Sequence, residues 1–253
     1  MNKTHEIQKV NELQEHSAML CIFGRRKCMN KQRLPVRLLV QLAITAACIT
    51  VATIVFRQSF FRVFPLYVSL VVGLLQAHVN RYSNLVGGCN AVLHGIVSLH
   101  YGLYGAAANS FLLAVPTQFI SFINWSKNRQ GQNPTLKKLT AKQFVIICVI
   151  LLVVEVPFCW FMASNNSRYA LLDSFAFLVG IVQNGLAMFR YKEYTIFLLI
   201  ACINGVFLYL FMSFQMPEQV TYLIYAIYTL YCAILACRNA QKLYIQQQKG
   251  NSL

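Results

Sequence analysis

The chain has 253 residues, of which 57% are apolar and only 11% are charged, with a mean hydropathy of +0.52. A soluble domain of this length carries about 25% charged residues, so the composition excludes an ordinary water-soluble fold. The net charge of +15 does not indicate a nucleic-acid partner, because the charges lie between long uncharged runs. The nine cysteines show no C-x-x-C spacing and no histidine partners, which argues against a zinc site or a disulfide framework.

The first 36 residues are polar and basic, and no short apolar segment with a processing site follows the start. A cleavable signal peptide is therefore not expected. Arginines and lysines between positions 25 and 37 border the first apolar run. This basic cluster can bind anionic lipid headgroups, or it can serve only to orient the chain in the membrane.

Eight apolar segments follow, and each is long enough to cross the hydrocarbon layer of a bilayer at about 1.5 Å per residue. The uncharged stretch 82–126 holds enough residues for two of them, and Gly102 and Gly105 predict the turn between these two helices. The predicted spans are 38–56, 63–80, two within 82–126, 144–163, 169–189, 194–216 and 219–237.

The distribution of basic residues predicts the orientation of these spans. With the amino terminus inside, 19 of the 22 Lys and Arg residues lie in cytoplasmic segments and 3 lie in external loops. Cytoplasmic loops of membrane proteins carry such an excess. We therefore expect a multi-pass protein of the cell inner (plasma) membrane, with both termini in the cytoplasm.

Two similar pentapeptides indicate an internal repeat. Val72–Gln76 reads VGLLQ and Val179–Gln183 reads VGIVQ, and an Arg-Tyr dipeptide follows each. Asn90 and Asn204 each lie 35 residues before the end of a helix pair. An odd number of helices per unit, joined by a single connector, puts both units in the same orientation, which is the plan of some transporters with a substrate site near the midplane. The predicted regions are a cytoplasmic basic tail (1–36), an extra N-terminal helix (37–62), a first repeat (63–126), a cytoplasmic loop with a connector helix (127–168), a second repeat (169–239) and a cytoplasmic tail (240–253).

A series of short motifs occurs in order over about residues 66–244. They are Gly87–Asn90, Gly102–Gly105, Gln118, Trp125, Leu172–Ser174, Ile181–Asn184, Arg190–Glu193 and Ile203–Asn204. In order and spacing these motifs resemble the PnuC-like vitamin and nucleoside transporters, typified by nicotinamide riboside uptake. The resemblance implies an all-α membrane protein of two parallel three-helix units, as in the sugar-transporting SWEET proteins. It also implies facilitated diffusion of an uncharged or zwitterionic vitamin-like solute, which cytoplasmic phosphorylation then traps.

The resemblance favours nicotinamide riboside as substrate. The family often has a tryptophan at the start of the seventh span, where this chain has Tyr194, Thr195 and Phe197. Thiamine, riboflavin and deoxynucleosides therefore stay open as substrates.

Uncharged polar groups and aromatic rings suit such a solute, because a strongly polar site would hold it too tightly for release. Polar residues on shared helical faces predict a water-accessible cavity within the bundle. An intramembrane Asn or Gln can instead bond to a neighbouring helix, and the tyrosines can be packing residues. The predicted substrate-binding residues are Gln118, Asn184, Asn204, Asn90, Trp125, Tyr225 and Tyr228.

Two acidic residues are candidates for a gate or for coupling. Asp173 lies near the outer end of the sixth span, where it can cap a helix, form a gate contact or bind substrate. Glu155 lies within the fifth span, and an ionisable group there is costly unless it is paired, hydrated or protonated. We expect Glu155 to be neutral or paired, for instance to His94 or His100, with proton coupling as the alternative.

The other function classes are less well supported. An enzyme would need a clustered nucleophile, paired carboxylates or a metal-ligand set, and the dispersed acidic residues and histidines offer none. We therefore predict no catalytic residue, no cofactor and no metal. A membrane sensor that binds ligand without moving it stays open. The expected partners are a small-molecule substrate and the lipid bilayer, with no nucleic acid, and a homo-oligomer is left open.

Overall fold

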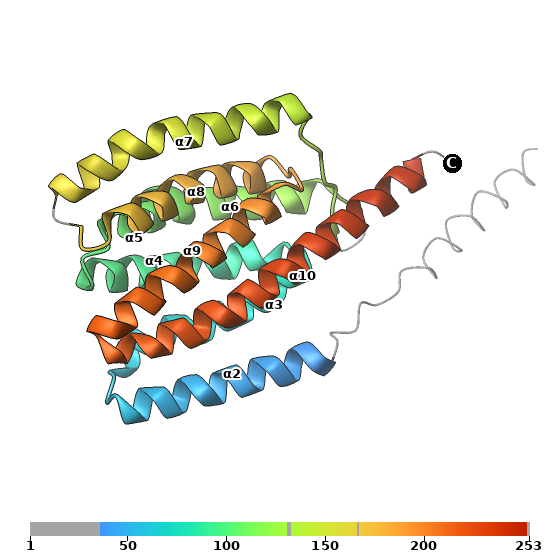
Figure 1. Ribbon diagram of the computed structural model, residues 1–253. Coiled ribbons are helices and arrows are strands. Elements are labelled where there is room, and N and C mark those ends of the chain that lie inside the picture. The colour runs from blue at the N-terminus through green and yellow to red at the C-terminus, as the bar shows by residue number, and fades with distance from the viewer. Residues whose placement is uncertain (1–35, 131–132, 166, 252–253) are drawn as a thin grey trace, which may run out of the picture. The chain divides into compact units, whose positions relative to one another are not determined.

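The computed structural model of the protein describes residues 36–130, 133–165 and 167–251 (Figure 1). Residues 1–36 form one unit and residues 37–253 another, and only the second is considered below. The predicted basic tail therefore lies outside the described residues, apart from its last residue, Val36.

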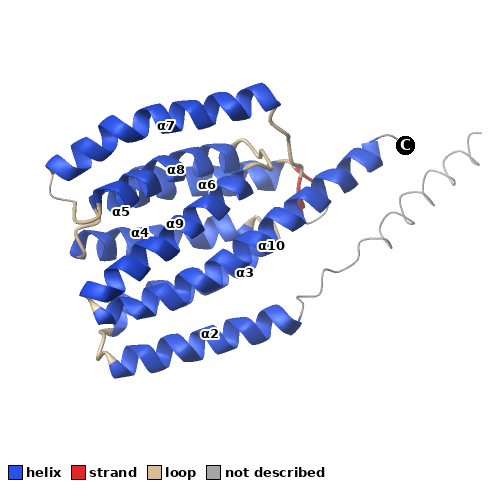
Figure 2. Ribbon diagram, in the orientation of Figure 1, coloured by secondary structure: helices blue, strands red, loops and turns tan. Residues whose placement is uncertain are grey.

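The described chain is almost entirely helical (Figure 2). The fourth predicted span is a single helical run in three parts, with a π-helix, η1, between α5 and α6. The helices are α2 (Val36–Val55), α3 (Phe60–Ala77), α4 (Tyr82–His100), α5 (Tyr104–Ala108), η1 (Asn109–Ala114), α6 (Val115–Lys127), α7 (Ala141–Ser164), α8 (Ala170–Met188), α9 (Tyr194–Gln215), the short 3₁₀-helix η2 (Pro217–Gln219) and α10 (Val220–Asn251).

Among the described residues, seven helical segments are long and apolar enough to cross a membrane. The protein is therefore an all-helical, multi-pass membrane protein. The helix outside this set is α4, which was one of the eight predicted spans. It has 19 residues, but Asn84, Asn90 and His94 lower its hydropathy, and all three are at least partly enclosed by neighbouring helices.

The predicted turn after the third span is present and depends on Gly102. The amide of Gly102 donates to the Leu99 carbonyl at 3.1 Å, and that of Leu103 donates to the Ser98 carbonyl at 2.9 Å. These two bonds form a Schellman motif, which ends a helix with a residue in the left-handed conformation. Gly102 takes this position with φ +70°, which glycine adopts without steric cost.

Six helical segments pack side by side as a closed ring. In each of two groups, α3–α4–α6 and α8–α9–α10, the second helix packs between the first and the third. The ring closes because α6 packs on α8 and α10 packs on α3. The third helix of each group therefore contacts the first helix of the other group.

Two helices lie outside this ring. The connector α7 packs on α8, and α2 is joined to α3 by a 2.8 Å hydrogen bond between Thr50 Oγ1 and the Tyr67 hydroxyl. Large apolar side chains on these helices are exposed, such as Trp160 of α7 at 74% and Ile54 of α2 at 70%. Such faces are stable against lipid, because lipid tails are as apolar as these side chains.

The last helix is longer than the predicted span 219–237, since α10 continues to Asn251 through the predicted tail. Contacts with the loop before α7 accompany this extension. Gln247 accepts from the Leu136 amide at 2.9 Å and donates to the Pro134 carbonyl at 2.8 Å. The same loop contains the two short strands β1 (Arg129–Gln130) and β2 (Asn133–Pro134).

Candidate functional site

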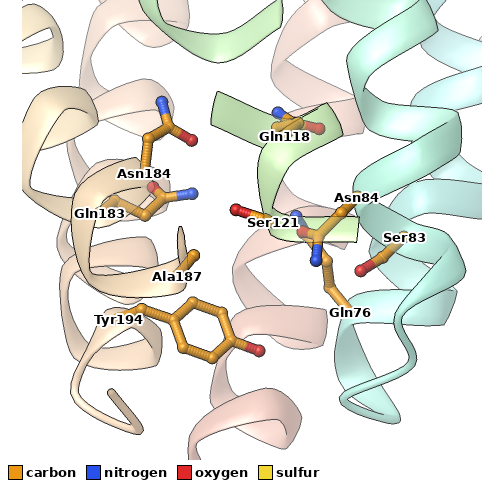
Figure 3. A pocket seen from close by; sticks show the side chains of 9 residues that line it. All are labelled: Gln76, Ser83, Asn84, Gln118, Ser121, Gln183, Asn184, Ala187 and Tyr194. Carbon is orange, nitrogen blue, oxygen red and sulfur yellow. The ribbon is translucent and has the colours of Figure 1, made fainter. Parts of the chain in front are cut away.

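A narrow polar cavity lies where α3, α4, α6 and α8 meet the start of α9 (Figure 3). The space not occupied by atoms among its side chains amounts to about 320 Å³, which includes solvent outside, and the enclosed part has room for about one water molecule. Among the described residues, its lining includes no Lys, Arg, Asp or Glu. The lining residues are Gln76, Ser83, Asn84, Gln118, Ser121, Gln183, Asn184, Ala187 and Tyr194.

Amide side chains face one another across this cavity. Figure 3 shows Gln183 and Asn184 of α8 on one side and Gln118 of α6 on the other. Within the described parts of the chain, these three amides form no hydrogen bond with the protein. Asn84 Nδ2 is also buried without a partner. Because buried polar groups are normally hydrogen-bonded, these amides are suited to a polar solute that supplies the partners.

The amide of Gln118 lies against Gly87 of α4. A Cβ atom added at Gly87 would lie only 2.2 Å from Gln118 Oε1 and 3.2 Å from its Cδ. Real Cβ atoms do not approach other atoms this closely, so the present position of the Gln118 amide requires glycine at position 87. Gly87, in the predicted motif Gly87–Asn90, therefore contributes to the cavity by leaving room for the Gln118 amide.

Two strained turns border the cavity. Val79 follows Gln76 with φ +52°, and Arg190 lies between Ala187 and Tyr194 with φ +65°. Both are in the left-handed region, which is a real outlier for a β-branched residue such as Val79. Such backbone is maintained only where the surrounding structure determines it, and it clusters at functional sites.

Trp125 was predicted to contact substrate, but it lies behind the cavity wall. Its side chain is 1% exposed, and its Nε1–H donates to the Ala187 carbonyl at 2.7 Å. Its ring packs edge to face with Tyr194, with 5.6 Å between the centroids. Trp125 therefore contacts two lining residues and is not itself a lining residue.

Asn90 and Asn204 also lie outside the cavity, where each bonds to a neighbouring helix. Asn90 donates to the Pro65 carbonyl of α3 at 3.1 Å and to Ser69 Oγ at 2.6 Å. Asn204 donates to the Leu172 carbonyl of α8 at 2.8 Å. Both contacts are interhelical hydrogen bonds, which were the alternative to substrate binding for these residues.

The two predicted tyrosines of α10 are likewise absent from the described lining. The Tyr228 hydroxyl donates to the Leu70 carbonyl at 3.3 Å, and its ring borders Gly73 of α3. The Tyr225 ring lies 6.2 Å from the His94 ring, centroid to centroid. These tyrosines pack α10 against α3 and α4.

Asp173 caps a helix. Its Oδ2 accepts from the Gly105 amide at 3.0 Å and from Ser167 Oγ at 3.1 Å, and its Oδ1 accepts from the Ala106 amide at 2.9 Å. These amides belong to the first turn of α5, where a helix has unpaired N–H groups and a partial positive charge. Of the roles considered for Asp173, capping accounts for the two amide contacts, and the Ser167 hydroxyl adds a third bond.

In the described structure Glu155 is paired with neither His94 nor His100, which were the example partners, and its neutral form stays a prediction. Glu155 Oε1 accepts from Ser174 Oγ at 2.5 Å, and its Oε2 is buried without a described partner. His94 Nε2 lies 2.6 Å from Ser69 Oγ, and His100 Nε2 lies 2.5 Å from an Arg62 nitrogen. The reason is positional, because α7 packs on α8, whereas both histidines are on α4.

The far end of the helix ring, near the start of α3, is closed by aromatic residues. The Tyr222 hydroxyl donates to the Arg62 carbonyl at 2.8 Å. The Tyr101 ring lies 6.0 Å from that of Tyr222 and 5.8 Å from the Arg62 guanidinium carbon. Arg62 and Gln76 are separated by about 21 Å along α3 at 1.5 Å per residue, so this closure and the cavity are at opposite ends.

Several lining residues were not predicted as sites. Gln76 and Gln183 end the two pentapeptides of the internal repeat, so their recurrence was a signal that could have identified them. Ser121 lies three residues after Gln118 on the same helical face, and this spacing was a signal that could have identified it. Ser83 and Asn84 follow the turn at Val79 and carry no comparable signal in the sequence.

A family model described as "Nicotinamide mononucleotide transporter" matches residues 59–238. The chain belongs to this family. The match starts just before α3, so α2 lies outside the region shared with the nicotinamide mononucleotide transporter family. The PnuC-like resemblance found in the sequence is thereby confirmed.

Two known proteins are similar to this chain. The "Nicotinamide riboside transporter PnuC" of Neisseria mucosa is 28% identical over 120 residues, which are 45% of this chain and 46% of that protein. The alignment thus spans about half of the relative's length. A crystal structure titled "Crystal structure of the Vitamin B3 transporter PnuC" matches with a TM-score of 0.72 at 22% identity, covering 85% of this chain and 93% of that chain. This second match shows a shared fold.

Proposed function

We propose that this protein carries nicotinamide riboside across the cell inner membrane by facilitated diffusion, and binds it at the polar cavity, which widens to admit the solute. The amides of Gln118, Gln183 and Asn184 would bond to the ribose hydroxyls and the carboxamide. The pyridinium ring of this solute is positively charged, and the face of Tyr194 would attract it through a cation–π contact. The unpaired amides around one aromatic ring are the observation that carries this proposal.

The lining favours the riboside over the mononucleotide. A phosphate group binds most strongly to Arg, to Lys or to a helix N-terminus. The described lining offers neither Arg nor Lys, and the amides of Ser83, Asn84 and Tyr194, at the starts of α4 and α9, already donate to backbone carbonyls. Phosphorylation of the solute in the cytoplasm would therefore yield a product that this cavity binds poorly, which would trap it inside the cell.

An internal repeat would place the cavity between two similar halves. Asn90 and Asn204 bond to the carbonyls of Pro65 and Leu172, and each of these acceptors lies seven residues before the start of a repeated pentapeptide. Gln76 and Gln183, which both line the cavity, also occupy equal positions in the pentapeptides.

The contacts between the halves support the same plan. Trp125 and Asn239 each lie 35 residues after one of the two asparagines. Each donates to a carbonyl near the end of the first helix of the other half, that of Ala187 and that of Ala77. Two parallel three-helix units, with α7 as connector and α2 as an addition, account for these bonds. In this arrangement α4 also crosses the membrane, which brings the number of spans to eight, and more apolar helices enclose it.

The orientation with both termini in the cytoplasm puts the cavity near the cytoplasmic end of the bundle. The closure by Arg62, Tyr101 and Tyr222 is then on the external side. A carrier open to one side at a time is closed at its other end, so this arrangement supports a carrier rather than a channel.

Flux into sealed liposomes tests the proposal. The purified protein is reconstituted without an imposed gradient, and uptake of radiolabelled nicotinamide riboside is measured with thiamine, riboflavin, deoxynucleosides and nicotinamide mononucleotide as competitors. We expect saturable uptake that stops at equal concentrations on both sides and is not inhibited by the mononucleotide. Inhibition by another competitor class would reassign the substrate, and saturable binding without flux would identify a sensor.

A further inference from the structure

Trp125 contacts both ends of one turn of the cavity wall. Before the turn, its Nε1–H bonds to the Ala187 carbonyl at 2.7 Å. After the turn, its ring packs against that of Tyr194 with an interplanar angle of 69°. The backbone between these residues passes through Arg190, which has a φ of +65°. Trp125 therefore supports a strained turn on both sides.

The neighbouring residue strengthens this attachment. Asn124 Nδ2 donates to the Met188 carbonyl at 2.7 Å, next to the bond made by Trp125. The end of α6 is thus held to the end of α8 by two consecutive side chains. Since Ser121 lies one helical turn before Trp125 and lines the cavity, α6 supplies both a wall residue and its support.

Tyr194 is the aromatic residue of the described lining. Its side chain is 4% exposed, and Figure 3 shows its ring across one end of the cavity. The side chain of Tyr194 has no hydrogen bond to any described residue. Edge-to-face packing is directional, so among the apolar neighbours of Tyr194 the Trp125 ring is a contact that can set how the Tyr194 face is presented to a solute.

We propose that Trp125 is a positioning residue, which sets the orientation of Tyr194 and thereby the selectivity for a planar aromatic solute. Trp125 acts through Tyr194 and does not touch the solute. This role rests on the proposed function, because the Trp125–Tyr194 pair can select a solute only if the carrier binds that solute through its aromatic ring.

Uptake by liposomes containing Trp125→Phe gives the first test. Phenylalanine retains a ring but removes the N–H that bonds to the Ala187 carbonyl. We expect the half-saturating concentration to rise about 2- to 10-fold, in line with the usual contribution of the lost hydrogen bond, while the maximal rate per folded protein is unchanged. The matched control is Trp160→Phe, since Trp160 is exposed on α7, and it should leave both quantities unchanged.

A double variant separates positioning from a general structural role. Tyr194→Ala removes the ring that Trp125 is proposed to orient, so Trp125→Phe should add nothing to it. Independent, multiplying effects of the two changes on the half-saturating concentration would overturn the positioning role. A loss confined to the maximal rate or to the yield of folded protein would also overturn it.

Fluorescence tests the contact without any solute. The chain has two tryptophans, so Trp160→Phe leaves Trp125 as its single tryptophan. In that background, Tyr194→Ala should shift the Trp125 emission to longer wavelength, because water from the cavity would reach the indole. Unchanged emission would overturn the contact. If the emission shifts but the unmodified protein neither binds nor transports any of the solutes, the proposed function fails, and the selectivity role of Trp125 fails with it.

Discussion

The carboxylate of Asp173 accepts a hydrogen bond from the Gly105 amide at 3.0 Å, although the two residues are 68 positions apart. A Cβ atom at Gly105 would lie 3.1 Å from Asp173 Cγ and 2.8 Å from Met162 Cε. Glycine at position 105 thus allows α8 and the connector α7 to approach the start of α5. The predicted turn residue Gly105 serves this close approach, while Gly102 provides the turn itself.

Asp173→Asn should destabilise the protein. Both carboxylate oxygens accept hydrogen bonds, so one of the donors would face an amide NH₂ group in the variant. We expect a loss of about 1–3 kcal/mol, the usual cost of breaking a hydrogen bond to a charged group. Thermal unfolding in detergent measures it, with Ser167→Ala as a control that removes one donor and costs less. Equal stability of Asp173→Asn and the unmodified protein would contradict the cap.

Gly87→Ala should weaken uptake with little effect on stability. The new methyl group would displace Gln118 Oε1, which is the end of a flexible side chain and can move at low cost. Loss of one bond of about 1 kcal/mol from Gln118 to the solute corresponds to an approximately fivefold higher half-saturating concentration. Gly205→Ala on α9 is the control, because a Cβ there meets no atom within 4 Å. Unchanged half-saturation in Gly87→Ala would exclude Gln118 as a substrate contact.

Asn204→Ala should affect stability, whereas Asn184→Ala should affect substrate binding. Asn204 bonds to the Leu172 carbonyl, and interhelical bonds of this kind average about 0.6 kcal/mol, so its loss should lower the melting temperature slightly. Asn184 lines the cavity and has no described partner, so its loss should raise the half-saturating concentration. Melting curves and uptake are measured on both variants. A reversed pattern would place Asn204 in the substrate path.

Glu155→Gln should leave uptake and its dependence on pH unchanged. The amide oxygen of glutamine can still accept from Ser174 Oγ, and Glu155 is not among the described lining residues. A buried carboxylate oxygen without a partner is costly if charged, so the neutral side chain should be tolerated at least as well. Initial uptake rates over a series of pH values test this. A pH dependence that disappears in Glu155→Gln would assign proton coupling to this residue.

Gln247→Ala should release the loop before α7. Gln247 bonds to the backbone of Pro134 and Leu136, which precede the exposed Lys137 and Lys138. Without these bonds, trypsin should cut after the two lysines faster than in the unmodified protein. Gln248→Ala, on an exposed face of the same helix, is the control. Equal cleavage rates would mean that the loop is held by its other contacts.

Seven of the eight spans could be predicted because long apolar runs have few alternatives to a membrane helix. The end of α10 could not, since Arg238 and Lys242 end the apolar run without ending the helix. What extends α10 is a contact with the loop before α7, which is distant in sequence. The π-helix η1 could not be predicted either, because the residues Asn109–Ala114 carry no pattern that distinguishes a π-helix from an α-helix.

The site was harder to predict than the helices. An asparagine within a span has the same local pattern whether it bonds to a neighbouring helix, as Asn204 does, or lines a cavity, as Asn184 does. Which of these occurs depends on the residues across the interface. Trp125 illustrates the same point, because a one-turn offset from Ser121 along α6 moves a side chain from the cavity wall to the layer behind it.

The bond from Asn239 to the Ala77 carbonyl, which joins α10 to α3, has a consequence for synthesis. Its donor and acceptor are 162 residues apart, so the donor leaves the ribosome long after the acceptor has entered the bilayer. Until then α3 lacks the neighbour that closes the ring, so the helices made first remain in the membrane as an incomplete, open bundle. Truncations that remove α10 should therefore leave an incomplete assembly intermediate for membrane quality control to degrade, even though every lining residue of the cavity has been made.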